Sequence, residues 1–237
     1  MPKPPPRQMH LTAAHVARVH RVVADPGAPA TELHNDADYA ERVLQMLATH
    51  PAPDQPTRLF AYGSLIWKPE IPHVAEALAT AHGWHRAFCL RQTRFRGAPD
   101  QPGLMMALDR GGQCQGMAYT MPPEDLPGQF DRLFRREFTV KPITNMPRWI
   151  KVVTGGQTLP ALAFVINRAS ANYAGRMAPE AVAAILATAC GHVGSGAEYL
   201  FNTVSHLEAK GIHDSALWQL QKRVAARIGA YAGLRFV

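Results

Sequence analysis

The sequence predicts an α/β fold in which one domain follows a helical N-terminal extension. Apolar residues at helical spacing mark both ends of the chain, whereas β-like runs fill residues 84–121 and 148–166. No internal repeat and no clear linker interrupts the chain. We therefore assign residues 1–35 to the extension, whose Pro-rich start is expected to be disordered, and residues 36–237 to a single domain.

Helical spacing predicts a first helix over residues 11–20 and a second over residues 36–50, and Pro51 and Pro53 end the second. The second helix is expected to bury one face, made of Tyr39, Val43, Leu44 and Leu47. A buried strand over residues 59–62 then stops at Gly63.

Three short strands are predicted next, at residues 87–90, 104–108 and 114–119, with a hairpin turn at residues 109–112. Two more strands, residues 148–153 and 159–166, flank Gly155 and Gly156. The C-terminal third predicts three helices. Pro179 opens the first. The second is striped by Tyr199, Leu200, Thr203, Val204 and Leu207 and ends at Gly211; the third, capped by Asp214, is striped by Leu217, Leu220, Val224 and Ile228.

The charge balance, a formal net charge of +7, favours small anionic ligands over nucleic acid because the positive residues are scattered. The densest clusters, residues 91–96 and 132–136, hold three arginines each. No apolar run approaches the ~20 residues that cross a bilayer, so no membrane partner is expected. The N-terminus lacks the apolar segment of a secretory signal, and the three cysteines are odd in number and far apart. These features predict a reducing compartment, by default the cytoplasm, and leave the oligomeric state open.

The strand end at Gly63 and Ser64 is the first candidate site. Glycine lets a ligand approach the backbone closely, and consecutive N–H groups in a turn suit a carboxylate. An ordinary strand-to-turn junction is the alternative interpretation.

Glu137 is the second candidate. At ~100° per residue, Phe130, Leu133 and Phe134 form one apolar helix face, and Glu137 falls inside that stripe. Burial and the C-terminal end of a helix both raise a carboxyl pKa from ~4.3 toward what a general base needs near neutral pH. Alternatively, Glu137 sits at a frayed helix end, turned to solvent or paired with Arg135 or Arg136.

No nucleophile elbow, phosphate loop or metal-binding motif competes with this glutamate. His82, His85 and Cys89 are the one combination that we considered for a metal, and ordinary surface and core roles are favoured for them. We therefore expect chemistry without a metal or another cofactor.

The chain resembles the ChaC-like γ-glutamylcyclotransferases, in particular the bacterial ChaC proteins, over about residues 11–220. The resemblance rests on residues 62–67, on Arg96-Gly97-Ala98-Pro99 with Pro102-Gly103, on Arg136-Glu137 followed by Pro147-Arg148-Trp149, and on Glu198-Tyr199-Leu200 leading to Leu207 and Gly211-Ile212. Phe138 and residues 140–146 depart from the glycine- and tyrosine-rich stretch of the family.

The resemblance implies a mixed, partly closed β-barrel with surrounding helices, and release of 5-oxoproline from glutathione. It makes Glu137 the catalytic base and residues 62–67 the substrate loop: Tyr62, Gly63, Ser64, Leu65, Ile66 and Trp67. Tyr199 is a further candidate to line the pocket, unless it is simply core. The chemistry fits, because the α-amine of a γ-glutamyl group can attack its own γ-carbonyl while one carboxylate shuttles the proton.

Two other functions stay open. In the first, the protein is a cyclotransferase for other γ-glutamyl amines or amino acids. In the second, it binds a γ-glutamyl or anionic partner without catalysis. Arg91, Arg94 and Arg96 are candidates to attract the glycine carboxylate of glutathione, and paired surface roles are the alternative for each of them.

Overall fold

The computed structural model describes residues 7–29 and 31–233. Residues 1–6, at the start of the segment predicted to be disordered, lie outside the described residues. The chain divides into two compact units, each assembled from separate segments. One, the barrel unit, holds residues 26–91 and 105–176; the other, the helical unit, holds the described parts of residues 1–25, 92–104 and 177–237.

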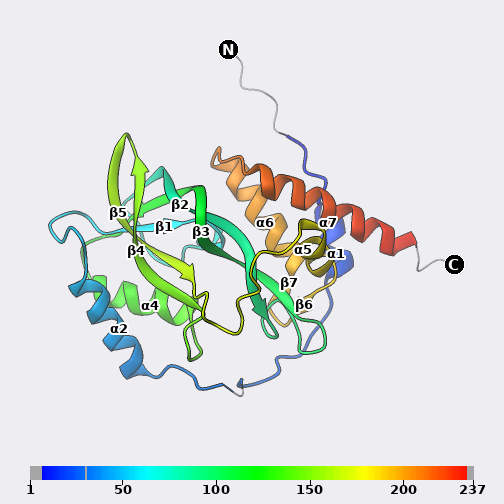
Figure 1. Ribbon diagram of the computed structural model, residues 1–237, viewed down its shortest axis with the longest axis horizontal. Coiled ribbons are helices and arrows are strands. Elements are labelled where there is room, and N and C mark those ends of the chain that lie inside the picture. Colours follow the sequence, from blue (N-terminus) through cyan, green and yellow to red (C-terminus); the bar gives the residue numbers. More distant parts are fainter. Residues whose placement is uncertain (1–6, 30, 234–237) are drawn as a thin grey trace, which may run out of the picture. The chain divides into compact units, whose positions relative to one another are not determined.

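The barrel unit is built around a closed barrel in the strand order β1-β3-β2-β4-β5 (Figure 1). Its strands are β1 (Arg58–Ala61), β2 (Ala75–Gln92), β3 (Gly103–Thr120), β4 (Asn145–Thr154) and β5 (Gln157–Ile166). Antiparallel pairing places Ala61 opposite Met117, and a parallel contact of Leu59 with Leu162 joins β1 to β5. The barrel core is apolar, and fully buried members include Phe60, Leu108, Tyr119, Leu162 and Phe164.

The β4–β5 hairpin confirms the sequence expectation, since Thr154 pairs with Gln157 across Gly155 and Gly156. Both glycines have positive φ, +54° and +78°, which the two-residue turn of a hairpin favours. The hairpin expected at residues 109–112 is wrong. One long strand, β3, passes through these residues, with Gly111 and Gly112 at positive φ inside it. The glycines therefore bend a strand and do not end it.

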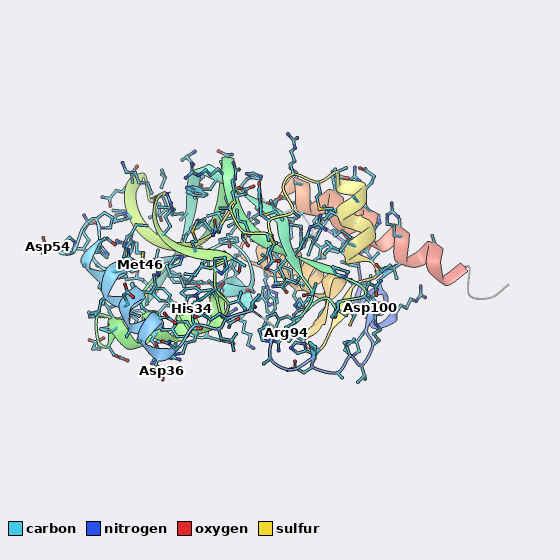
Figure 2. All side chains as sticks on the ribbon, turned by 60° about the horizontal axis from the view of Figure 1, so that its bottom comes forward. His34, Asp36, Met46, Asp54, Arg94 and Asp100 are labelled. Carbon is cyan, nitrogen blue, oxygen red and sulfur yellow. The ribbon has the colours of Figure 1, made fainter. Side chains whose placement is uncertain are left out.

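Three helices belong to the barrel unit: α2 (Asp36–Ala48), the short α3 (Ser64–Trp67) and α4 (Leu126–Glu137). The buried residues of α2 are Tyr39, Val43 and Met46. Leu44 is 68 % exposed and Leu47 is only half-buried, so the buried face of α2 includes Met46 in place of these two leucines. Figure 2 shows Met46 between α2 and the rest of its unit, with Asp36 and Asp54 at the outside.

The helical unit contains α1 (Ala13–Val19), α5 (Pro179–Leu186), α6 (Gly196–Ala209), α7 (Ser215–Gly233) and the small pair β6 (Cys190–Gly191) and β7 (Gly194–Ser195). All four helices were expected from the sequence. Pro179 opens α5, and Asp214 accepts a hydrogen bond from the Leu217 backbone N–H at 3.0 Å. The predicted stripes of α6 and α7 are buried.

Candidate active site

The loop after β1 is anchored by its buried side chains and by hydrogen bonds to neighbouring strands. Tyr62 is buried, and its hydroxyl donates to the Phe164 carbonyl of β5 at 2.8 Å. Leu65 and Ile66 are buried, and the Tyr119 hydroxyl donates to the Ile66 carbonyl at 3.4 Å. These contacts fix the backbone at Gly63 and Ser64, where α3 begins.

Glu137 is the last residue of α4. It lies on the same face of this helix as three apolar side chains that are buried. Phe130, Leu133 and Phe134 are at most 1 % exposed, as the sequence predicted. Asp125 caps the start of the helix by accepting from the Gly128 N–H at 3.1 Å. The Glu137 side chain is 14 % exposed, which excludes the frayed, solvent-facing alternative.

The surroundings of Glu137 favour its neutral form. Burial raises the pKa of Glu137 to about 7; the Arg136 guanidinium opposes this rise, Glu70 adds to it, and the hydrogen bond from Asn145 opposes it. The Asn145 amide donates to Oε2 at 3.2 Å, and Arg136 Nε lies 3.3 Å from Oε1. A pKa near 7 lets one carboxyl take up and return a proton at neutral pH.

Arg136 connects this carboxylate to the loop. Its Nη2 donates to the Ser64 hydroxyl oxygen at 3.2 Å, and its Nη1 donates to the Lys68 carbonyl and lies 3.6 Å from Glu70. The structure therefore brings together the two candidates from the sequence, the Gly63-Ser64 loop and Glu137.

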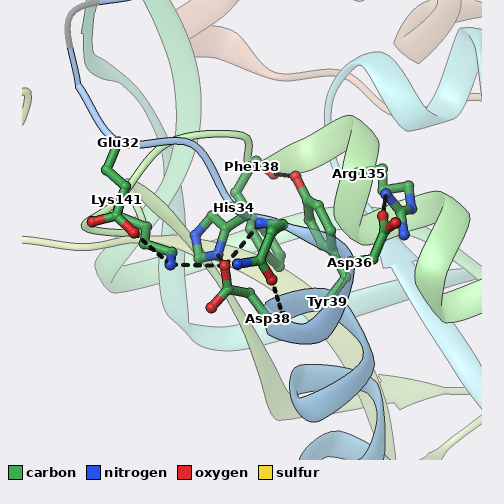
Figure 3. A network of polar contacts seen from close by, with 9 residues as sticks. Glu32, His34, Asp36, Asp38, Tyr39, Arg135, Phe138 and Lys141 are labelled. Atoms are coloured by element: carbon green, nitrogen blue, oxygen red, sulfur yellow. Dashed lines mark hydrogen bonds and ion pairs between the residues drawn. The ribbon is translucent and has the colours of Figure 1, made fainter.

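The end of α4 is anchored from α2, as Figure 3 shows. The Tyr39 hydroxyl donates to the carbonyl of Phe138, the residue after Glu137, at 3.0 Å. Arg135 pairs with Asp36 at 2.8 Å and with Asp131 at 2.7 Å. Of the two arginines considered as partners of Glu137, Arg136 is the one in contact with it.

Asn145 was missed by sequence reasoning. It lies eight residues after Glu137, at the start of β4, within the segment that departs from the family pattern. A polar residue at the first position of a strand is ordinary in a sequence. Its buried position beside a carboxylate depends on how β4 and α4 meet.

Tyr199 lies in the helical unit, on α6, and is 2 % exposed. The Arg96 guanidinium lies over its ring, 5.4 Å from the centroid, and pairs with Glu198 at 2.6 Å. Arg94 pairs with Asp25 at 2.9 Å. Arg94 and Arg96, considered as attractors of a substrate carboxylate, thus already bind carboxylates of their own unit.

Among residues 7–29 and 31–233, no three His, Cys, Asp or Glu side chains gather as a metal site. His85 contacts the Gly111 carbonyl at 3.0 Å, and Cys89 is buried, which raises the pKa of its thiol to about 12. Over the same residues, no helix is both long enough and apolar enough to span a bilayer.

A buried carboxyl of raised pKa beside a Gly-Ser loop on a closed barrel is suited to take up and return a proton. The family model described as "ChaC-like protein" matches residues 57–227, from the strand before this loop to within α7. The chain belongs to this family.

Curated relatives agree in sequence over much of their length. The chain is 37 % identical to the glutathione-specific gamma-glutamylcyclotransferase of Escherichia coli, over 75 % of this chain and 77 % of that protein. It is 32 % identical to the mouse glutathione-specific gamma-glutamylcyclotransferase 1, over 65 % of this chain and 70 % of that protein.

Solved structures agree in fold. The yeast gamma-glutamyl cyclotransferase specific to glutathione superposes with a TM-score of 0.64, covering 73 % of this chain and 100 % of that one. The identity is 19 %, so this likeness bears on the fold alone.

Proposed function

We propose that this protein cleaves glutathione by cyclisation of its γ-glutamyl group, which releases 5-oxoproline and cysteinylglycine. The relatives named above carry this activity in their names. The observation that carries the proposal in this chain is Glu137, a buried carboxyl whose pKa is raised to about 7 beside the Gly63-Ser64 loop.

Glu137 acts as the base that takes a proton from the substrate α-ammonium. The freed amine attacks the γ-carbonyl carbon of the same molecule and forms a new C–N bond. Because nucleophile and electrophile share one molecule, the protein's main task is to hold the cyclising conformer. The resulting oxyanion collapses, the C–N bond to cysteine breaks, and Glu137 returns the proton to the leaving nitrogen. Glu137 then takes the second proton from the ring nitrogen, which becomes the lactam N–H, and passes it to the released amine, which becomes an ammonium. No water is consumed and no electrons are transferred.

The substrate loop comprises the residues Tyr62, Gly63, Ser64, Leu65, Ile66 and Trp67. The backbone at Gly63 and the Ser64 hydroxyl are suited to bind the glutamyl carboxylate and to stabilise the oxyanion. Tyr62 contributes shape, because its hydroxyl is engaged with Phe164. Tyr199 remains proposed as a substrate contact.

The protein works without a metal, a reactive thiol or a nucleotide, because the cyclisation needs none of them. We also place it in the cytoplasm. Cys89, Cys114 and Cys190 are all buried, and none of the three forms a disulfide, which supports a reducing compartment.

The test is incubation of the purified protein with glutathione and mass detection of 5-oxoproline and cysteinylglycine. Activity is expected to survive dialysis against a chelator and replacement of each cysteine by serine. A comparison of kcat/KM with γ-glutamyl-alanine and γ-glutamyl-cysteine then sets the substrate. Preference for a dipeptide would overturn the choice of glutathione and keep the cyclisation; absence of 5-oxoproline with every substrate would reject both.

The loop has its own test in Gly63→Val, which adds a branched side chain where the backbone is expected to approach the substrate. Circular dichroism checks the fold, and a glutathione titration measures binding. We expect a folded protein with weakened binding. Unchanged affinity in the folded variant would reject this loop as the substrate site.

A further inference from the structure

Besides its ion pair with Glu137, Arg136 contacts two further residues beside the candidate site, Ser64 and Lys68. Its side chain is 18 % exposed, and all three guanidinium nitrogens have partners. Nε faces Glu137, Nη2 donates to Ser64, and Nη1 donates to the Lys68 carbonyl. These partners lie on two separate segments: Glu137 ends α4, whereas Ser64 begins the short α3 and Lys68 follows its end.

We propose that Arg136 is a positioning residue that fixes the Ser64 hydroxyl and the Glu137 carboxylate in one arrangement for the cyclisation. The proposal rests on the function proposed above. The planar guanidinium suits this role, since its five N–H donors have a fixed geometry that a lysine ammonium does not reproduce.

The contact determines what the Ser64 hydroxyl can do. A guanidinium only donates hydrogen bonds, so the Ser64 oxygen accepts from Arg136 at 3.2 Å. The hydroxyl proton is then left to point elsewhere. Arg136 therefore presents Ser64 as a donor toward an anionic oxygen, which is the role the substrate carboxylate or the oxyanion needs.

The same guanidinium affects the proton affinity of Glu137. The groups facing Glu137 are Arg136 from its own helix, Glu70 from the segment after α3, and Asn145 from β4. Arg136 and Asn145 lower the pKa of Glu137, and Glu70 raises it. Removal of the Arg136 charge leaves the effects of burial and Glu70 less opposed, so less Glu137 is ionised at neutral pH.

Two substitutions separate these effects. Arg136→Lys keeps the positive charge but loses the fork that reaches Ser64 and Lys68, whereas Arg136→Gln loses both. Arg132, on the same helix, is the matched control. It is 51 % exposed and pairs only loosely with Asp125, at 3.6 Å.

The experiment measures kcat and KM for glutathione from about pH 5.5 to about pH 9 in all these variants. Arg136→Lys is expected to lower kcat/KM by about 10- to 100-fold, because small misplacements at a reacting centre are costly. Its acidic limb stays at the wild-type position. Arg136→Gln is expected to show the same loss and an acidic limb about one unit higher. Arg132→Lys and Arg132→Gln behave as wild type.

Wild-type kcat/KM in Arg136→Lys would overturn the positioning role. An unmoved acidic limb in folded Arg136→Gln would overturn the electrostatic part. If Arg136→Gln does not fold, Ser64→Ala, Arg136→Lys and the double variant that combines them test the contact instead. The double variant should lose little more than Arg136→Lys alone if both act through one contact, and additive losses would refute that contact.

This outcome is separable from failure of the proposed function. Wild-type protein that releases no 5-oxoproline rejects the function itself. An active wild type, an inactive Glu137→Gln and a normal Arg136→Lys would reject the role of Arg136 alone.

Discussion

The barrel unit contains two buried carboxylates, Glu137 and Asp109, whose pKa values are shifted in opposite directions. The side chains of Glu137 and Asp109 are 14 % and 7 % exposed, respectively. Burial raises the pKa of both carboxyls. The pKa of Glu137 rises to about 7, whereas the pKa of Asp109 lies below its usual value.

The difference comes from the hydrogen bonds that each carboxylate accepts. Asp109 accepts from Arg168 Nε at 2.6 Å, from the Arg110 N–H at 2.8 Å and from the Tyr173 hydroxyl at 2.9 Å. Together these outweigh its burial. Glu137 accepts one longer bond, from Asn145 at 3.2 Å, beside Arg136 at 3.3 Å. A buried carboxylate that accepts several short hydrogen bonds has a lowered pKa and stabilises the fold. One that accepts few hydrogen bonds has a raised pKa and exchanges its proton near neutral pH.

The largest effect is expected from Glu137→Gln, which keeps the shape of the side chain and removes the proposed base. Turnover of glutathione should fall by roughly 10²–10⁴-fold, while binding survives. Steady-state kinetics and a binding titration test this directly. Near wild-type turnover would reject Glu137 as the base.

The same substitution should stabilise the protein. A carboxyl whose pKa is raised from 4.5 to about 7 on folding destabilises the folded state once it ionises. The penalty is absent below pH 4.5, grows between pH 4.5 and about 7, and reaches up to about 3 kcal/mol above that. Chemical denaturation should therefore show Glu137→Gln more stable than wild type at about pH 8. The two should converge at about pH 4.5; a gap independent of pH would contradict the raised pKa.

The sequence predicted Glu137 but not Asp109, for a physical reason. Glu137 breaks the apolar stripe of a helix, and a helix is local, so Phe130, Leu133 and Phe134 suffice to place it. Asp109 stands before Arg110 and two glycines, which is typical of a turn. Its main partner, Arg168, is 59 residues away, and only the closed barrel brings them together.

The fold shows the same division. The helices other than the short α3 were predicted, and so was the β4–β5 hairpin, because their periodicity and turn residues are local. The merging of the expected strands at residues 104–108 and 114–119 into β3 was not, since it depends on pairing with distant strands. Leu44 was expected on the buried face of α2 and Met46 was not, because apolar character alone does not show which face of the helix packs against the barrel.

Asp109→Asn should affect stability and leave turnover unchanged. The substitution weakens the pairing with Arg168 and is expected to cost about 1–3 kcal/mol of unfolding free energy at neutral pH. Because the pKa of Asp109 is lowered in the folded state, its contribution is present above the unfolded value of 3.8 and is lost as pH falls through the folded value. Wild type and variant should converge in acid. A loss of turnover in the folded variant would show that the two carboxylates are not independent.

The smallest effect is expected from Asn145→Ala, which removes the hydrogen bond that Asn145 donates to Glu137. That bond lowers the pKa of Glu137, so its loss should move the acidic limb of the kcat/KM profile upward by less than about one unit. Tyr173→Phe is the matched control, since it removes one hydrogen bond from Asp109 and none from Glu137. It should lower stability slightly and leave the limb in place. If both variants move the limb, the two carboxylates titrate as one network. If only Asn145→Ala moves it, the hydrogen bonds at each carboxylate set its proton affinity separately.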